Sequence, residues 1–251
     1  MKKLLKFELK KLLKSKYFYI IAIISFAFVI ISGLTTKAIN NALIEKGESV
    51  DPYSAYLFTK SALSGTYTLL VGIFVALFAT EDNSNGTIKN IYARGYSRTL
   101  VYFAKYVVSL LAVIVISLLT VWIAYIYSNS VWGNALAITD NVAVIVLGQL
   151  LGICAYHAIF FAISSIFCKN SSAIALNIIG PMAVSLVLGL GDAFIKSENV
   201  RLTSYWLDSL FSNFTSAVSD TKLLPVGIAL FIVYTVAAIV VGLLINRKKE
   251  I

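Results

Sequence analysis

The residues of this chain best suited to binding lie in one polar segment, residues 81–105, between two long apolar runs. The segment contains the carboxylates Glu81 and Asp82, the pair Gly86-Thr87, and the cations Lys89, Arg94, Arg98 and Lys105. Such side chains form ion pairs and charge-assisted hydrogen bonds with a protein or lipid surface. The segment contains no histidine or cysteine. We therefore expect it to bind a partner rather than to catalyse a reaction.

No catalytic or metal-binding pattern is evident in the rest of the sequence. The single histidine, His157, lies in an apolar run without an acidic residue. Cys154 and Cys168 lie 14 residues apart in that run, about 21 Å along a helix, which is too far for a disulfide. A phosphate-binding GxxxxGK[ST] sequence is missing. We expect no enzyme activity, metal or cofactor in this chain, and interpret His157 as a hydrogen-bonding residue between helices.

The elements that must position the polar segment are long apolar helices. The chain has 251 residues, of which 59% are hydrophobic and 13% charged, whereas a soluble domain carries about 25% charged residues. A helix that crosses the membrane needs about 20 apolar residues. Six runs qualify: 17–36, 62–79, 102–127, 142–167, 173–191 and 223–245. We predict an all-α membrane protein, with one transmembrane domain over residues 1–251 and a polar connecting loop at 80–101.

The distribution of charge predicts the orientation of the spans. With both ends inside, 15 of the 21 basic residues and only four of the 12 acidic residues fall in inner segments. This distribution follows the positive-inside rule, so we expect a multi-pass protein of the cell membrane with both termini cytoplasmic. The net charge of +9 then reflects topology and contact with anionic membrane lipid, and we expect no nucleic-acid partner.

Two further segments are predicted to lie near the membrane surface. Residues 1–16 form a basic amphipathic helix in which Leu5, Leu9 and Leu12 share one face, a pattern typical of helices that lie in the headgroup plane. Basic residues preceding the first span would give the same charge pattern. Residues 192–222 form the largest outer segment, whose aromatic clusters predict an interfacial or re-entrant helix.

A short helix is predicted inside the polar loop. Thr87 is a suitable N-cap residue, and Ile88, Ile91 and Tyr92 form an apolar stripe at helical spacing. Gly95 follows where a left-handed C-terminal stop is expected. The stripe fits a groove on a partner protein, and it equally fits an interfacial helix resting on lipid.

The fifth run contains Asn177, Gly180 and Pro181. A proline inside a helix removes a backbone donor and introduces a kink. Two interpretations follow: a flexible element that lines a transport path, or a kink packed against neighbouring helices.

The loop resembles the coupling-helix loop of type-2 ATP-binding-cassette (ABC) permeases. The resemblance is carried by Glu81, Gly86-Thr87-Ile88-Lys89-Asn90, Gly95, Ser97-Arg98 and Lys105, together with the basic N-terminal segment, the six spans and the basic tail. It is closest to the small permeases resembling bacitracin, lantibiotic-immunity and cytolytic-peptide exporters. Many related permeases carry a proline just before the Ser-Arg pair, whereas this chain has Arg94-Gly95-Tyr96, which leaves the substrate class open.

The resemblance implies an elbow helix at the N-terminus and a cytoplasmic coupling helix between spans two and three. It also implies a separate ABC ATPase, which would hold ATP and Mg, and a second permease subunit, identical or different. Ile88, Ile91 and Tyr92 would insert into the ATPase, Glu81 would lie near that contact, and Arg94 and Arg98 would fix the loop. Residues expected to support coupling also include Gly86, Thr87 and Lys89. Substrate would pass along spans two and five, near Ser64, Gly65, Thr68, Asn177 and Pro181.

The expected function is export of an amphipathic or hydrophobic peptide, such as a toxin, bacteriocin or antimicrobial peptide, for secretion or immunity. Export of a small ion or drug is the alternative within the same class. An ATP-independent transporter or channel, or a structural membrane anchor, is the alternative from another class. On the predicted boundaries no acidic or basic residue lies near the middle of a span, which disfavours ion coupling.

Overall fold

The computed structural model describes residues 1–46, 55–132, 142–167, 169–195, 201–215 and 223–248. Within these ranges the chain forms ten α-helices, one short 3-10 helix and no strand. The elements are α1 (Lys2–Lys14), α2 (Lys16–Glu45), α3 (Ala55–Ser61), α4 (Gly65–Ser84), α5 (Ile88–Ala93), α6 (Arg98–Trp132), α7 (Val142–Ile166), α8 (Asn170–Ile195), η1 (Leu202–Tyr205), α9 (Leu207–Thr215) and α10 (Leu223–Lys248).

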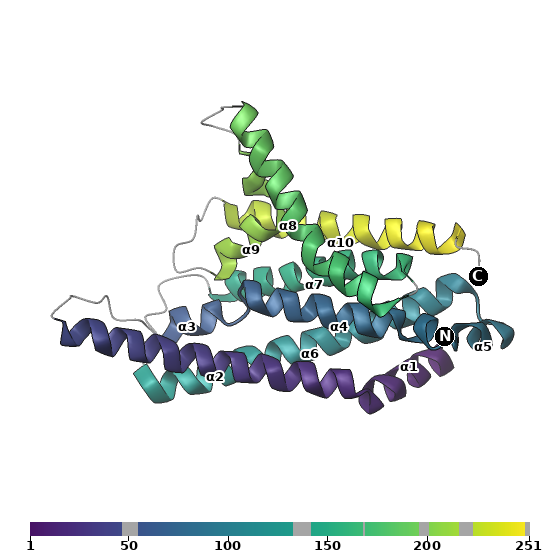
Figure 1. Cartoon of the computed structure of the whole chain (residues 1–251), viewed down its shortest axis with the longest axis horizontal. Helices are drawn as coiled ribbons and strands as arrows, with labels where there is room; N and C mark the ends of the chain where they lie inside the picture. The colour runs from purple at the N-terminus through teal and green to yellow at the C-terminus, as the bar shows by residue number, and fades with distance from the viewer. Residues whose placement is uncertain (47–54, 133–141, 168, 196–200, 216–222, 249–251) are drawn as a thin grey trace.

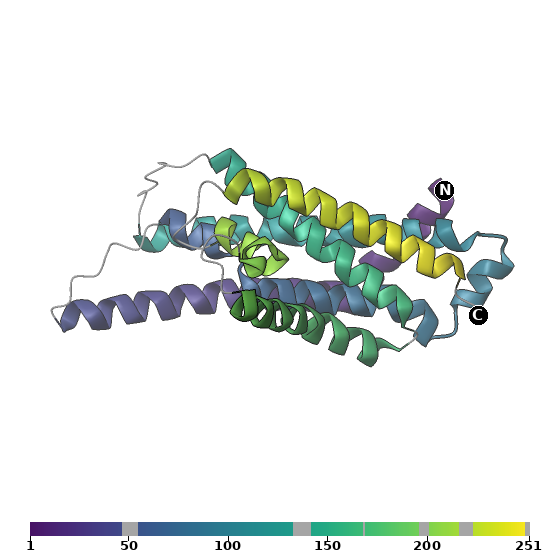
Figure 2. The ribbon, with the colours of Figure 1, turned by 90° about the horizontal axis from the view of Figure 1, so that it is seen from above.

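The predicted membrane architecture is confirmed. Six helical stretches are long and apolar enough to span a membrane: Lys16–Glu45, Leu57–Ser84, Arg98–Trp132, Val144–Ile166, Asn170–Ile195 and Leu224–Arg247. They run roughly side by side in an elongated bundle (Figures 1 and 2). The protein is therefore an all-α membrane protein with six spanning helices.

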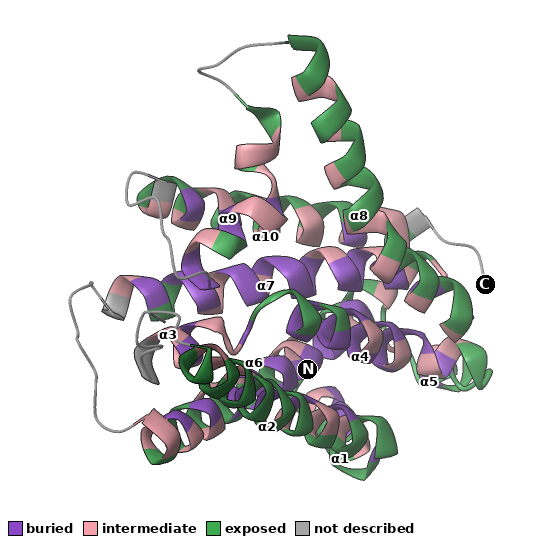
Figure 3. Ribbon diagram, turned by 60° about the vertical axis from the view of Figure 1, so that its left-hand side comes forward, coloured by how far each residue is buried: buried purple, intermediate pink, exposed green. Residues whose placement is uncertain are grey.

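The centre of the bundle is formed by α7, which packs against α4, α6, α8, α9 and α10. Buried residues concentrate in α4, α6 and α7, whereas α2 and the far half of α8 are mostly exposed (Figure 3). The exposed side chains of α2, α8 and α10 are largely apolar. Such faces suit contact with hydrocarbon or with another membrane subunit rather than with water.

The helices extend well beyond the apolar runs that predict them, so several helix ends lie inside the segments predicted as loops. The first span ends at Glu45 rather than residue 36, the polar residues 81–84 belong to α4, and α6 begins at Arg98. Hydropathy marks only the apolar part of a helix. Residues with high helix propensity, such as Lys, Glu and Ala, continue a helix readily, whereas glycine disfavours it; Gly47 and Gly86 follow these ends in the sequence.

The two ends of the bundle are formed by different helices. One end holds α1, α5 and the end of α10, and the opposite end holds α3 and α9 (Figure 1). Helix α8 contains Pro181 and changes direction along its length, so that its second half diverges from the bundle (Figure 1). The kink predicted from Pro181 is thus present, while its role stays a prediction.

Candidate functional site

The loop between α4 and α6 is built around two glycines. Gly86 has φ 69° and Gly95 has φ 84°, a left-handed conformation that glycine adopts without steric cost. Gly86 turns the chain after α4, and Gly95 stops α5 as predicted. Ser97 precedes α6, where its Oγ accepts a hydrogen bond from the Leu100 amide (3.4 Å). These turns fix α5 next to the start of α6.

Thr87 occupies the N-cap position of α5, but its side chain does not cap the helix. Its hydroxyl instead donates toward the carboxylate of Asp82 (3.0 Å) and lies near the Asp82 carbonyl oxygen (3.4 Å). The predicted helix start is therefore correct in position, and the threonine serves to tie α5 back to α4.

The Ile88 and Ile91 side chains of the α5 stripe face the rest of this chain, and their insertion into an ATPase stays a prediction. Both side chains are only 8% exposed and pack with Leu4 of α1 and with Val101 and Ala104 of α6. The sequence identifies the stripe, but a neighbouring amphipathic helix competes for it. Leu4 of α1 covers Ile88 and Ile91, whereas Tyr92 is half-buried and borders the outward face of α5.

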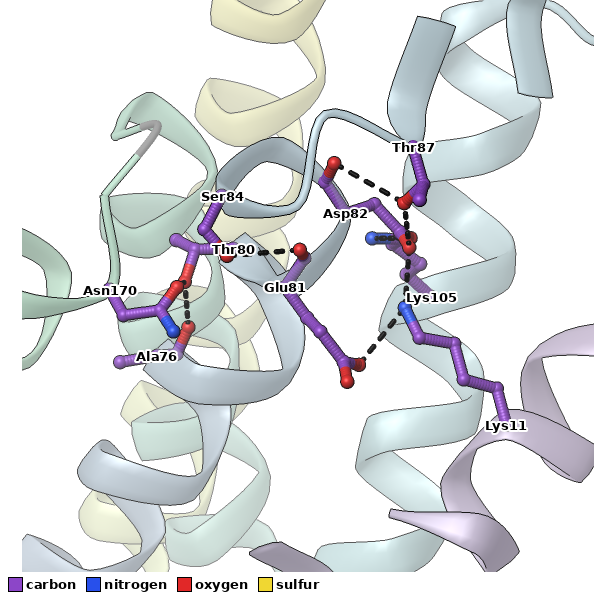
Figure 4. Close-up of polar contacts among 9 residues, drawn as sticks. All are labelled: Lys11, Ala76, Thr80, Glu81, Asp82, Ser84, Thr87, Lys105 and Asn170. Carbon is purple, nitrogen blue, oxygen red and sulfur yellow. Dashed lines mark hydrogen bonds and ion pairs between the residues drawn. The ribbon is translucent and has the colours of Figure 1, made fainter. Parts of the chain in front are cut away.

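A buried ion-pair network lies directly behind the loop (Figure 4). The Asp82 carboxylate pairs with Lys105 of α6 and with Lys11 of α1, the latter at 2.6 Å. Glu81 also pairs with Lys11 at 3.0 Å. The side chains of Asp82 and Lys105 are each 6% exposed, so both charges are largely removed from water. Three helices, α1, α4 and α6, are thereby joined at one point.

The network perturbs the acid–base behaviour of α1. Burial by itself would lower the pKa of Lys11, but the adjacent Asp82 and Glu81 carboxylates outweigh it and raise that pKa. Glu8, one turn earlier, is fully buried, and neither carboxylate oxygen has a hydrogen-bond partner within the described chain. Burial raises the pKa of Glu8, because the charged form is poorly solvated there.

The buried face of α1 differs from the predicted one. Leu4, Glu8 and Leu12 point into the bundle, whereas Leu9 is exposed. The three inward residues are four positions apart, so they form one helical face, and Glu8 lies in the middle of it. An apolar stripe alone does not reveal this position.

A second contact anchors the same end of α4. The Thr80 hydroxyl lies 2.7 Å from Asn170 Oδ1, at the start of α8, and 2.6 Å from the Ala76 carbonyl oxygen (Figure 4). Thr80 is fully buried. The end of α4 is thus held on one side by α1 and α6 and on the other by α8.

The outward side of the loop is basic. Lys89 and Arg94 are exposed. A groove of about 410 Å³ is lined by Lys89, Tyr92, Tyr96, Ser97 and Arg98, with the Arg98 guanidinium 6.0 Å from the centre of the Tyr92 ring. Arg94 borders a neighbouring cavity between α1 and α5. These residues form an exposed basic surface at this end of the bundle.

Asp82, Lys11 and Glu8 are the residues of this site that the predicted set lacks. Asp82 lies next to the predicted Glu81 and makes the more buried contacts. A sequence signal existed for Lys105, a lone cation in the long apolar run of α6, and for Glu8, the only acid among seven lysines. A charge in such a place requires a partner or a shifted pKa.

The residues predicted to line the substrate path fall around two cavities. Gly65, Thr68, Asn177 and Pro181 line one cavity of about 400 Å³ between α4, α7, α8 and α9. Ser64 does not line this cavity; it borders a smaller one of about 140 Å³ between α2, α3 and α4. Asn177 is buried and donates to the Gly72 carbonyl oxygen and to Ser164 Oγ, both at 2.9 Å. The fifth span is therefore tied to the second at this point.

His157 is a hydrogen-bonding residue between helices, as predicted. The ring is fully buried and its Nε2 lies 2.8 Å from Ser109 Oγ of α6. Tyr106 and Phe161 pack against it. Among the described residues no group of three or more His, Cys, Asp and Glu side chains could hold a metal ion.

Six spanning helices with a polar, internally anchored loop between the second and third define a multi-pass membrane protein. The family described as ABC-2 family transporter protein matches residues 4–192. The match covers more than half of the chain, so the chain belongs to this family, whose members are membrane permeases of ABC transporters. No curated protein and no solved structure gave a significant match.

Proposed function

We propose that this chain is the permease subunit of an ATP-driven exporter and that its ATPase docks on the outward face of α5. The observation that carries this proposal is the exposed basic surface around Lys89 and Arg94, held from behind by a buried ion-pair network. The family match supports an ABC permease, which works with an ATPase subunit. ATP and Mg would be bound by that subunit, and the chemistry of hydrolysis would take place there.

The proposed orientation places α5 and both termini in the cytoplasm. The start of α1, helix α5 and the end of α10 lie at the same end of the bundle (Figure 1), and residues 1–16, residues 81–105 and the C-terminal tail together carry 14 of the 21 basic residues. The positive-inside rule assigns such an end to the cytoplasm. A cytoplasmic ATPase would then meet α5 directly.

The anchoring contacts suggest how movement of the ATPase would reach the spans. Pressure on α5 would pass to α6 through the Gly95 turn and through the packing of Ile91 on Val101. The contacts of Asp82 with Lys11 and Lys105 would carry it to α1 and α4. The loop and three helices would therefore move together.

Substrate would pass beside the cavity lined by Thr68, Asn177 and Pro181, with a second permease subunit completing the path. The largely apolar cavity wall favours an amphipathic or hydrophobic peptide, and a small hydrophobic drug would use the same surface. The partner permease would cover exposed apolar faces such as that of α8.

The test uses the full chain co-expressed with the ABC ATPase encoded beside its gene and purified through a tag on this chain alone. We expect the ATPase to co-purify and hydrolyse ATP. The double variant Lys89→Glu/Arg94→Glu should lose association, because both side chains are exposed and the reversed charge repels an acidic docking surface.

The matched control is Lys37→Glu, an exposed lysine on α2 away from α5, which should leave association unchanged. Loss of association in the control as well, or retention in the double variant, would contradict docking on this face. Ile91→Asp is a poor test of docking, because Ile91 is buried inside the chain and the variant disturbs the loop itself.

A further inference from the structure

The cavity between α4, α7, α8 and α9 contains one charged residue, Asp208, among its described lining residues. Asp208 stands in the first turn of α9, in the predicted outer segment. Helix α9 is fixed against the bundle because Leu210, Phe211 and Phe214 are buried, and Gln149 of α7 donates to the Phe214 carbonyl oxygen at 2.8 Å. The carboxylate is therefore held in place beside the cavity.

Neutral donors surround the carboxylate. The Tyr156 hydroxyl donates to one oxygen, while Ser185 Oγ (2.9 Å) and Trp206 Nε1 (3.1 Å) donate to the other. These donors orient and stabilise an anion without neutralising it. No ion pair among the described residues includes Asp208. A partly buried carboxylate without a cationic partner among the described residues thus remains at the cavity.

The remaining wall suits the apolar part of a ligand. Leu69, Phe160, Ile178, Met182 and Phe211 supply most of it. Asn177 also lines the cavity, is 1% exposed, and its Oδ1 has no hydrogen-bond partner in the described part of the chain. Both polar groups that lack a counterpart, the Asp208 charge and the Asn177 oxygen, are acceptors. A cavity whose unpaired polar groups are acceptors favours a cation with N–H donors, whereas an anion would meet repulsion from the Asp208 carboxylate.

We propose that this cavity is a binding subsite for an organic cation, a primary ammonium or guanidinium group on an apolar body, with Asp208 as its counter-charge. That the bound cation is also the transported substrate rests on the proposed function. If it is, the substrates of this permease are positively charged amphiphiles. Binding itself needs no ATPase. The cavity volume of about 400 Å³ lies within the usual range of ligand sites.

A purely structural role for Asp208 gives a different expectation. Its three hydrogen bonds join α7, α8 and α9, so it could act only as a clamp. A clamp requires acceptor oxygens but no net charge, and its loss would weaken binding of charged and neutral ligands alike. The charge dependence of binding therefore separates the two roles.

The experiment measures binding to the full-length chain in nanodiscs of zwitterionic lipid, by equilibrium dialysis with radiolabelled n-octylammonium, n-octanol and octanoate. Partition into empty nanodiscs is subtracted. We expect n-octylammonium to bind at least tenfold more tightly than n-octanol, and octanoate to bind least. Asp208→Asn should weaken n-octylammonium binding at least tenfold and leave n-octanol binding within twofold, while Asp208→Glu retains the preference for the cation.

A second variant covers the case in which Asp208→Asn fails to fold. Met182 lines the same cavity as Asp208 and is 64% exposed, so Met182→Lys can be accommodated and brings a competing ammonium group to the cavity wall. We expect at least a tenfold loss of n-octylammonium binding, with Met182→Leu as the unaffected control. Equal binding of the three probes, or equal losses for cation and alcohol in both variants, would overturn the subsite. Because no ATPase is present, that result is independent of the docking test.

Discussion

The buried pair of Asp82 and Lys105 provides the sharpest prediction about what holds the loop in place. The two side chains are each 6% exposed and in direct contact. Asp82→Asn leaves the Lys105 ammonium buried without its carboxylate, and breaking a buried pair in this way costs about 3–5 kcal/mol. Glu81 still faces Lys11, which reduces the loss. We therefore expect the free energy of unfolding to fall by about 3 kcal/mol.

A double-mutant cycle isolates the interaction. Lys105→Met removes the cation but keeps much of the side-chain volume, and it leaves Asp82 paired with Lys11. The double variant Asp82→Asn/Lys105→Met removes both charges, so neither one is left buried without its partner. The double variant should therefore be more stable than the sum of the single effects by about 2 kcal/mol. Lys89→Gln, an exposed position on the same loop, should change stability by less than about 0.5 kcal/mol.

The assay is denaturant unfolding of the purified chain in detergent micelles, supported by thermal melting. A loss of 3 kcal/mol corresponds to a melting temperature lower by about 6–12 °C for a chain of this size. If Asp82→Asn costs less than about 1 kcal/mol, or if the single effects simply add, the buried pair does not hold the three helices together and the anchoring account is wrong.

Three further outcomes are expected. Burial raises the pKa of Glu8 in the folded state above its ordinary value of 4.5. The contribution of Glu8 to the free energy of unfolding is therefore full below pH 4.5 and is lost as the pH rises through the raised pKa. Unfolding curves at several pH values should show this loss of stability in the wild type and not in Glu8→Gln. Gly152→Ala places a Cβ 2.4 Å from the Phe211 ring and should cost about 1–3 kcal/mol by overpacking, whereas Gly189→Ala, where a Cβ meets nothing within 4 Å, should not destabilise; equal effects in melting would contradict the close packing of α9. A reporter fused after Ile251 should be cytoplasmic, and an external reporter would reverse the proposed topology.

Sequence pattern predicts the architecture well because the membrane imposes it. Six runs of apolar residues identify six spanning helices, since a backbone in hydrocarbon must satisfy its own hydrogen bonds. Local turn chemistry is equally readable: Gly95 adopts the left-handed conformation that ends α5. The ends of the helices are less predictable, because polar residues extend a helix beyond the apolar run, as they do from Lys37 to Glu45 in α2.

At the loop, the sequence alone does not predict which surface each side chain contacts, because that depends on how distant helices pack together. The stripe formed by Ile88 and Ile91 fits lipid, an ATPase groove or another helix of the same chain, and only the position of α1 decides between them. The pairing of Lys11 with Asp82, 71 positions apart, has no periodic signature. Charges in unfavourable places remain the best indication, because a buried ion such as Lys105 requires a partner nearby.

The central claim, that an ABC ATPase docks on the exposed face of α5, is tested most directly by site-specific photo-crosslinking. A benzophenone amino acid would replace Asn90, which is exposed on α5, or Ser130, which is exposed near the far end of α6, in the chain co-expressed with its ATPase. We predict a crosslink to the ATPase from position 90 and none from position 130. A crosslink from position 130 alone, or none from position 90 in a complex that still co-purifies, would contradict the account.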